Sequence, residues 1–270
     1  MEDVKAITNW LDHRRPRERF LWVFCCLLAV AMLPSGLHAG EARQSSLSSK
    51  FAGLAHEGLE KARKHYEADP KNAERAWRLG KAFFFSGEFA TNKVAHLQLA
   101  ESGIAVSRQA LAAKSESPEA CYYLAMNQGQ LARTKLLGAL PLVREMAKNL
   151  RTVATTKPKL DFAGPDRSLG LIYRDAPGWP ISVGSKKKAR VHLRKAFALV
   201  PEYPENIIVL LETWIKWKDR KQLKLDLSVG KAVLQEARKK LTGSQWAPFW
   251  DDWDRRWHSI RESSRLLLPE

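Results

Sequence analysis

The residue types that most often carry catalysis or bind metals are present in this 270-residue chain, but they form no recognisable constellation. The histidines of residues 40–270 are scattered, and no two stand at ligand spacing near a suitable carboxylate, so we expect no zinc site. Residues 164–170, Gly-Pro-Asp-Arg-Ser-Leu-Gly, lack the Lys-Ser/Thr ending of a phosphate-binding loop. Asp166 within this segment is expected to cap the following helix instead. The sequence therefore predicts a protein that is not an enzyme and uses no metal or cofactor.

Residues suited to recognition gather between positions 174 and 182. Pro177, Gly178 and Pro180 interrupt any helix there, so the segment is predicted to be a stiff loop that carries an aromatic plate, an arginine and an aspartate. Alternatively, Trp179 plugs a gap at the helix ends and the prolines only rigidify the turn. The candidate partner- or ligand-binding residues are Arg167, Tyr173, Arg174, Asp175, Trp179, Lys186 and Lys187.

The formal net charge of +16 is concentrated in the later part of the chain. Clusters of Lys and Arg occur at 186–190, 216–224 and 238–240. Such a surplus suits an anionic partner, either a membrane surface or an acidic protein face, although a solvated helix surface would also explain it. No nucleic-acid-binding motif is recognisable, so nucleic acid is not an expected partner.

The first 39 residues have the layout of an export signal. Four arginines between positions 14 and 19 precede an uncharged stretch at 20–33, and a small residue, Ala39, follows shortly after. Residues 1–39 are therefore predicted to be a signal peptide or an N-terminal membrane anchor, with a buried helix of a cytosolic protein as the remaining alternative. Either export interpretation places residues 40–270 in the periplasm or on the extracytoplasmic face of a membrane. Cys121 is the single cysteine of that body and cannot form an intramolecular disulfide.

The candidate residues are expected to be positioned by helices. Ala, Leu, Lys, Arg and Glu, which favour helices, make up most of the segments between short Pro/Gly breaks. We predict an all-α protein, with helix boundaries good to about two to four residues. The expected helices are 47–67, 72–87, 92–114, 118–136, 140–156, 166–175, 185–199, 204–218, 226–241 and 247–264.

A repeat emerges from the spacing of similar short patterns. Leu79-Gly80 is followed by Leu124-Ala125 after 45 residues, by Leu169-Gly170 after another 45 and by Leu210-Leu211 after 41. An aromatic residue stands three positions after the glycine in the two clearest copies. A second pattern, Ala189-x3-Leu193-x2-Ala196-Phe197 ending at Pro201, predicts a partner helix with small residues where two helices cross.

At these residues the chain resembles the tetratricopeptide repeat, whose first helix carries Trp-x2-Leu-Gly-x2-Tyr and whose second carries Ala-x3-Phe-x2-Ala before a Pro. The resemblance covers roughly residues 50–241 and implies helical hairpins stacked into a compact solenoid. The period is longer than the 34 residues of the family. Tyr173 and Ala189 lie 16 residues apart, about seven more than in an ordinary unit. The candidate loop is therefore expected to be an insertion between two paired helices.

A narrower resemblance is carried by residues 164–206. This segment resembles the bacterial family that includes the T-component of periplasmic TRAP transporters and, more distantly, the regulator of microtubule dynamics family. The resemblance implies an envelope scaffold that serves a periplasmic substrate-binding protein during solute uptake. A protein partner is expected in that case.

The end of the chain is predicted to be an amphipathic helix. Trp246, Trp250, Trp253 and Trp257 recur at three or four residue intervals. The helix is expected to cap the repeat stack by covering its last apolar face. The alternative is an interfacial helix, in a structural membrane-associated protein whose basic face and Trp-rich helix hold it against lipid.

Overall fold

A computed structural model describes residues 38–134 and 138–268. The predicted leader at 1–39 lies outside the described residues except for its last two positions, which begin the first described helix. Among the described residues, no helix is both long enough and apolar enough to cross a bilayer.

The described residues are all-helical, as expected, and no strand occurs among them; a single isolated bridge joins Gly178 and Gly184. All ten predicted helices are present. The helices are α2 (His38–Glu67), α3 (Ala73–Gly87), α4 (Lys93–Ala113), α5 (Pro118–Thr134), α6 (Ala139–Thr156), α7 (Gly164–Asp175), α8 (Lys186–Leu199), α9 (Pro204–Trp217), α10 (Arg220–Lys240) and α11 (Ala247–Leu267). A short 3₁₀ turn, Ser244–Trp246, precedes α11.

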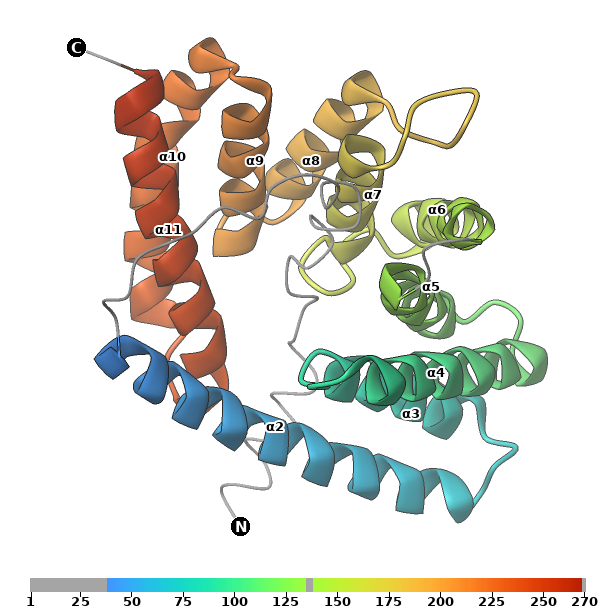
Figure 1. Cartoon of the computed structure of the whole chain (residues 1–270). Helices are drawn as coiled ribbons and strands as arrows, with labels where there is room; N and C mark the ends of the chain where they lie inside the picture. Colours follow the sequence, from blue (N-terminus) through green and yellow to red (C-terminus); the bar gives the residue numbers. More distant parts are fainter. Residues whose placement is uncertain (1–37, 135–137, 269–270) are drawn as a thin grey trace.

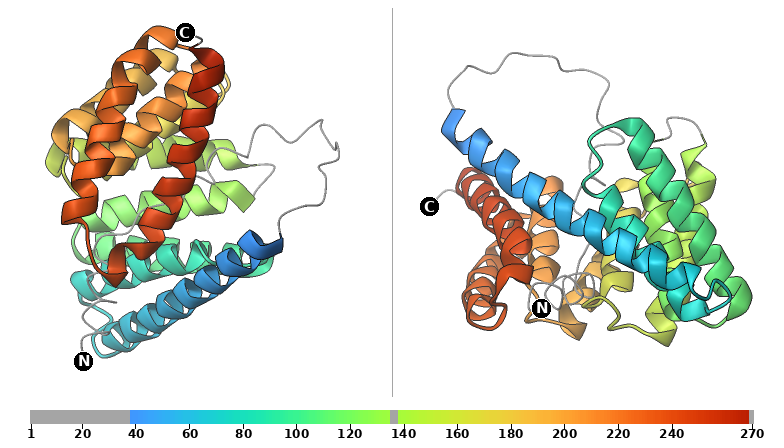
Figure 2. Two further views of the ribbon diagram at one scale, coloured as in Figure 1. Left: turned by 90° about the vertical axis from the view of Figure 1, so that its left-hand side faces the viewer. Right: turned by 90° about the horizontal axis from the view of Figure 1, so that it is seen from below.

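The helices pack mainly against their neighbours in sequence. From α2 to α10 each helix contacts the next, and α11 folds back onto α9. Figure 1 shows the result, a curved stack that begins with α2 and ends with α9, α10 and α11. Figure 2 (left) faces the side on which α2 and α11, the two ends of this stack, are both visible. The fold is therefore a succession of paired helices, in which most contacts are local.

Two helices begin well before the predicted residue: α2 begins at His38 and not at residue 47, and α10 begins at Arg220 and not at residue 226. For α10, Asp219 is the physical reason. Its carboxylate accepts a hydrogen bond from the backbone N–H of Gln222 (3.2 Å) and so satisfies one of the free donors of the first turn. The basic residues at 220–224 are thus part of a helix and not of a linker.

Close helix crossings are built on the small residues of the repeat pattern. A Cβ atom on Gly170 of α7 would lie 2.4 Å from Leu193 Cδ2 of α8, and one on Gly80 of α3 would lie 2.3 Å from Ser107 Oγ of α4. Neither helix pair could approach as closely with a larger residue. The pairing of the two sequence patterns, Leu169-Gly170 with Ala189-x3-Leu193, is confirmed by this contact.

Gly170→Leu is expected to destabilise the protein by about 1–3 kcal/mol or more, because the new side chain must displace Leu193 at a crossing that has no room for it. Thermal unfolding followed by circular dichroism measures this loss. Gly53→Leu is the matched control, because a Cβ at that helical glycine meets nothing within 4 Å. Equal melting temperatures for the two variants would mean that α7 and α8 do not cross at Gly170.

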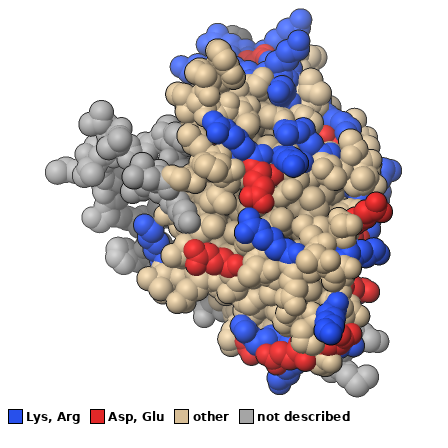
Figure 3. All heavy atoms as spheres, turned by 90° about the vertical axis from the view of Figure 1, so that its right-hand side faces the viewer, with Lys and Arg blue, Asp and Glu red and all other residues tan. Residues whose placement is uncertain are grey.

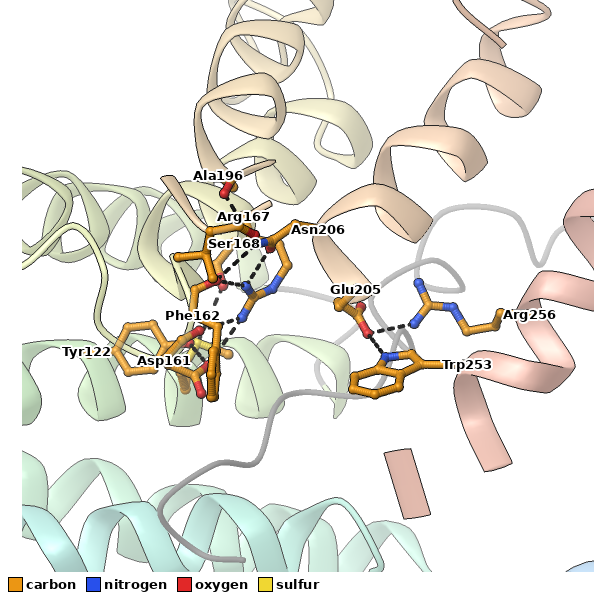
Figure 4. Close-up of polar contacts among 12 residues, drawn as sticks. Tyr122, Asp161, Phe162, Arg167, Ser168, Ala196, Glu205, Asn206, Trp253 and Arg256 are labelled. Atoms are coloured by element: carbon orange, nitrogen blue, oxygen red, sulfur yellow. Dashed lines mark hydrogen bonds and ion pairs between the residues drawn. The ribbon is translucent and has the colours of Figure 1, made fainter. Parts of the chain in front are cut away.

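The last helix covers α9. Trp246, Trp250 and Trp253 are buried, with Trp253 only 1% exposed. Trp253 Nε1 donates a hydrogen bond to Glu205 Oε2 (3.0 Å), and Arg256 forms an ion pair with the same oxygen (2.9 Å), so α11 is tied to the start of α9 (Figure 4). The tryptophans therefore pack inside the protein, as the capping interpretation predicts, and do not form an exposed interfacial face.

Candidate functional site

The loop between α7 and α8 is held in place at several points. The Ser185 N–H donates to the Tyr173 carbonyl (2.7 Å), and the Gly184 N–H donates to the Pro177 carbonyl (2.8 Å), so the ends of the loop are closed against each other. From the neighbouring α6, Arg144 donates to the Ile181 carbonyl (2.8 Å). Gly184 must be glycine, because a Cβ there would lie 2.0 Å from the Ala176 carbonyl oxygen. The Trp179–Pro180 peptide bond is cis.

Trp179 lies at the surface of this loop. Its side chain is 88% exposed, and Ile181 two residues later is 58% exposed. Ser182 is buried and Val183 packs against the core, so they turn the chain back towards the helices. The plug interpretation of Trp179 is therefore wrong. The inserted segment is an anchored loop that presents two apolar side chains to solvent, and in Figure 1 it projects from the α7–α8 pair.

Arg167 is a buried residue that holds a turn. It is 2% exposed, and its guanidinium forms an ion pair with Asp161 (3.2 Å) and donates to the Asn206 side-chain oxygen (2.9 Å) (Figure 4). It also donates to the carbonyls of Asp161 and Phe162. These two residues and Ala163 have φ between 49° and 62°, so three consecutive non-glycine residues adopt the left-handed conformation. Tyr122 completes the cluster by donating to Asp161 Oδ2 (2.7 Å).

The next three candidates, Tyr173, Arg174 and Asp175, also lie inside or at the edge of the fold. Tyr173 and Arg174 are 3% and 7% exposed. Arg174 binds Asp175 with two nitrogens (3.0 and 2.9 Å) and donates to Thr213 of α9 (3.1 Å). Lys216 pairs with the same Asp175 carboxylate. Arg174 and Asp175 therefore form a polar tie between α7 and α9, whereas the Tyr173 hydroxyl accepts a hydrogen bond from Arg151 of α6 (3.2 Å).

The expectation that Asp166 caps α7 is wrong. The helix begins at Gly164 after Ala163, whose left-handed backbone offers no side-chain cap, and Asp166 lies within the first turn. Its carboxylate is buried and contacts His192 Nδ1 (2.8 Å) and Lys195 Nζ (2.9 Å) of α8. The preceding left-handed turn, and not a capping side chain, sets where α7 starts. Asp166 therefore lies inside the first turn of α7, where its side chain contacts α8.

Lys186 and Lys187 begin α8 and are exposed. They line a shallow groove of about 480 Å³ together with Arg190, Val191, Trp217 and Asp219. The groove lies between α8 and the connection from α9 to α10. Two of the seven candidates therefore share a surface depression, while Trp179 lies on the adjacent loop.

Sequence reasoning missed the other residues that build this groove. Arg190 stacks over Trp214 and Trp217, with its guanidinium carbon 4.6 and 5.6 Å from the ring centroids, and forms an ion pair with Asp219 (2.8 Å). The hydrogen bond from Arg190 lowers the pKa of the Asp219 carboxyl. A signal for the stacking was available in the spacing of the two tryptophans, one turn apart at the end of α9.

Among the residues that the structure describes, no group of three or more His, Cys, Asp or Glu side chains could hold a metal ion. A scan against models of known protein families and a search of curated proteins found no match to this chain.

Proposed function

We propose that the protein is a non-enzymatic scaffold of tetratricopeptide-like helical repeats that docks a protein partner through the loop between α7 and α8. The repeat assignment is supported by the small residues at the α3–α4 and α7–α8 crossings and by the sequential pairing of helices. It also rests on the sequence patterns around Leu79, Leu169 and Ala189.

The observation that carries the docking proposal is the 88% exposure of Trp179 on an anchored loop. Exposed tryptophan is costly in water, and tryptophan is enriched among the residues that dominate binding energy at protein interfaces. The loop is closed by its own backbone hydrogen bonds and by Arg144, so little conformational entropy would be lost when a partner covers it. Ile181 adds a second exposed apolar side chain beside Trp179.

The cavity beneath this loop favours a protein over a small solute as the ligand. Ala176, Pro177 and Ser182 of the connection line a crevice of about 50 Å³ together with residues of α5, α6 and α7. Sites for small organic ligands typically enclose about 300–1,000 Å³. The crevice is therefore suited to one small apolar side chain of a partner surface that also covers Trp179.

The predicted export signal supports a location in the periplasm or on the extracytoplasmic face of a membrane. Because residues 164–206 resemble the T-component family of TRAP transporters, a periplasmic substrate-binding protein is the first partner to test. The protein would then be auxiliary to a solute-uptake system.

Trp179→Ala is expected to leave the melting temperature unchanged, because the side chain contributes little to the core. It should weaken partner binding at least about tenfold, as loss of an interface tryptophan does. A photo-crosslinking amino acid placed at position 179 in intact cells identifies the partner, and titration of the purified pair measures the affinity of each variant.

Leu266 supplies the matched control, because it is 84% exposed and lies on α11, far along the chain from the loop. Crosslinks from position 266 should not include the partner found at 179, and Leu266→Ala should bind it normally. The docking proposal fails if position 179 yields no reproducible crosslinked protein, or if Trp179→Ala binds the identified partner as tightly as the parent.

A further inference from the structure

One end of the molecule gathers a surplus of exposed cations. Arg190 of α8 pairs with Asp219, and Arg194 pairs with Asp226 of α10 (2.7 Å), so the starts of α8 and α10 lie side by side with the end of α9. Figure 3 shows Lys and Arg side chains clustered at the upper end of the molecule. The exposed cations of this basic end are Lys186, Lys187, Lys188, Lys218, Arg220, Lys221 and Lys224.

The carboxylates at this end are already engaged by other cations. Asp219 binds Arg190, and this hydrogen bond keeps the pKa of Asp219 low, so the carboxyl stays ionised and paired. Asp226 accepts hydrogen bonds from Arg194 and from Trp214 Nε1 (2.7 Å), and Asp175 is bound by Lys216. The seven cations of the basic end form no ion pair within the part of the chain that the structure describes. Their positive charges are therefore exposed to solvent and are not neutralised by neighbouring carboxylates.

Exposed apolar side chains lie among these cations. Val191 of α8 and Leu225 of α10 are each 58% exposed. The half-buried Trp217 lines the groove together with Val191 and lies under Arg190 and Lys186, whose Nζ is 5.9 Å from the ring centroid. The basic end thus combines exposed lysines with two exposed aliphatic side chains, Val191 and Leu225.

We propose that the basic end binds a membrane surface that displays anionic lipid headgroups. Six of its seven cations are lysines, which are depleted at protein–protein interfaces and act as hydrated point charges. The arginines suited to paired recognition of carboxylates, Arg174, Arg190 and Arg194, are already paired with carboxylates of the protein itself. A diffuse negative surface needs no fixed pairing geometry, and Val191 and Leu225 can enter its interfacial layer.

The basic end adjoins the loop that carries Trp179 but does not include Trp179, so the membrane proposal does not depend on the proposed protein partner. The test uses the full chain and compares sedimentation with vesicles containing about 30% anionic phospholipid against purely zwitterionic vesicles. The ratio of the two affinities isolates the electrostatic contribution, because any apolar contribution of residues 1–39 is common to both vesicle types.

The variant Lys187→Glu/Lys221→Glu/Lys224→Glu is expected to reduce the preference for anionic vesicles about 100-fold, at about fivefold per lysine. The preference of the parent should also fall as salt rises from about 0.1 M to about 0.5 M. The matched control Lys61→Glu/Lys71→Glu/Lys148→Glu changes the net charge equally at exposed lysines on α2, the α2–α3 turn and α6, and should keep most of the preference.

The proposal is overturned if the first triple variant keeps the parental preference, or if the control loses as much as the first variant does. It is also overturned if polyglutamate binds the parent more tightly than the anionic vesicles with the same dependence on Lys187, Lys221 and Lys224, because the partner would then be an acidic protein. Circular dichroism of both variants establishes that each is folded as the parent is.

Discussion

Arg167→Met is expected to lower the free energy of unfolding by about 3–5 kcal/mol, because it removes the cation that faces the buried Asp161 carboxylate. Methionine keeps most of the side-chain volume, so the loss reports on charge and hydrogen bonding. Arg167 also donates to the carbonyls of Asp161 and Phe162 in the left-handed turn and to Asn206 of α9. The melting temperature should fall by about 2–4 °C per kcal/mol for a chain of this size.

A double-mutant cycle separates the ion pair from the other contacts of Arg167. Asp161→Asn removes the negative charge, so Arg167→Met should cost less in that background than in the parent. Equal costs in both backgrounds would show that the Asp161 ion pair contributes nothing and that the carbonyl contacts account for the whole effect. A melting temperature of Arg167→Met equal to that of the parent would contradict the burial of this arginine.

The fold was largely predictable because local patterns decide helices. Prolines and glycines mark most helix ends, and the pairing of α7 with α8 follows from Gly170 and the Ala189-x3-Leu193 pattern. The sequence predicts the start of α10 six residues late, because the charged stretch at 220–225 has no apolar periodicity of its own. The capping role of Asp219 was the available signal.

The candidate site was less predictable, because burial depends on residues distant in sequence. Arginine is usually exposed, but Arg167 is buried by partners that include Asn206, 39 positions away. The loop was correctly predicted to be non-helical from its prolines, whereas the exposure of Trp179 depends on whether the helix ends leave a gap to fill. That property belongs to the packing of α6, α7 and α8 and has no local signature. The basic end likewise joins two charge clusters that only the contact between α8 and α10 brings together.

Trp253→Ala is expected to lower the free energy of unfolding by about 3–5 kcal/mol, because it removes a large side chain that is 1% exposed and opens a cavity between α11 and α9. The ring packs edge to face on Tyr203 and Trp250, with centroid distances of 5.5 and 4.9 Å. The substitution also removes the hydrogen bond from Nε1 to Glu205, whose carboxylate remains close to Arg256. The helices of the stack contact mainly their neighbours, and the terminal helix stabilises the last apolar face. The loss of hydrogen-exchange protection should therefore be largest in α9 and α10.

Hydrogen exchange measures where protection is lost, and thermal unfolding measures how much stability is lost. Trp179→Ala is the matched control, because it deletes the same side chain at a position that is 88% exposed and should leave both measurements unchanged. If Trp253→Ala melted like Trp179→Ala, α11 would not cap the stack, and its tryptophans would be available to another surface. If protection were lost equally from α3 to α10, the stack would unfold as one cooperative unit in which stability is not carried by nearest-neighbour contacts.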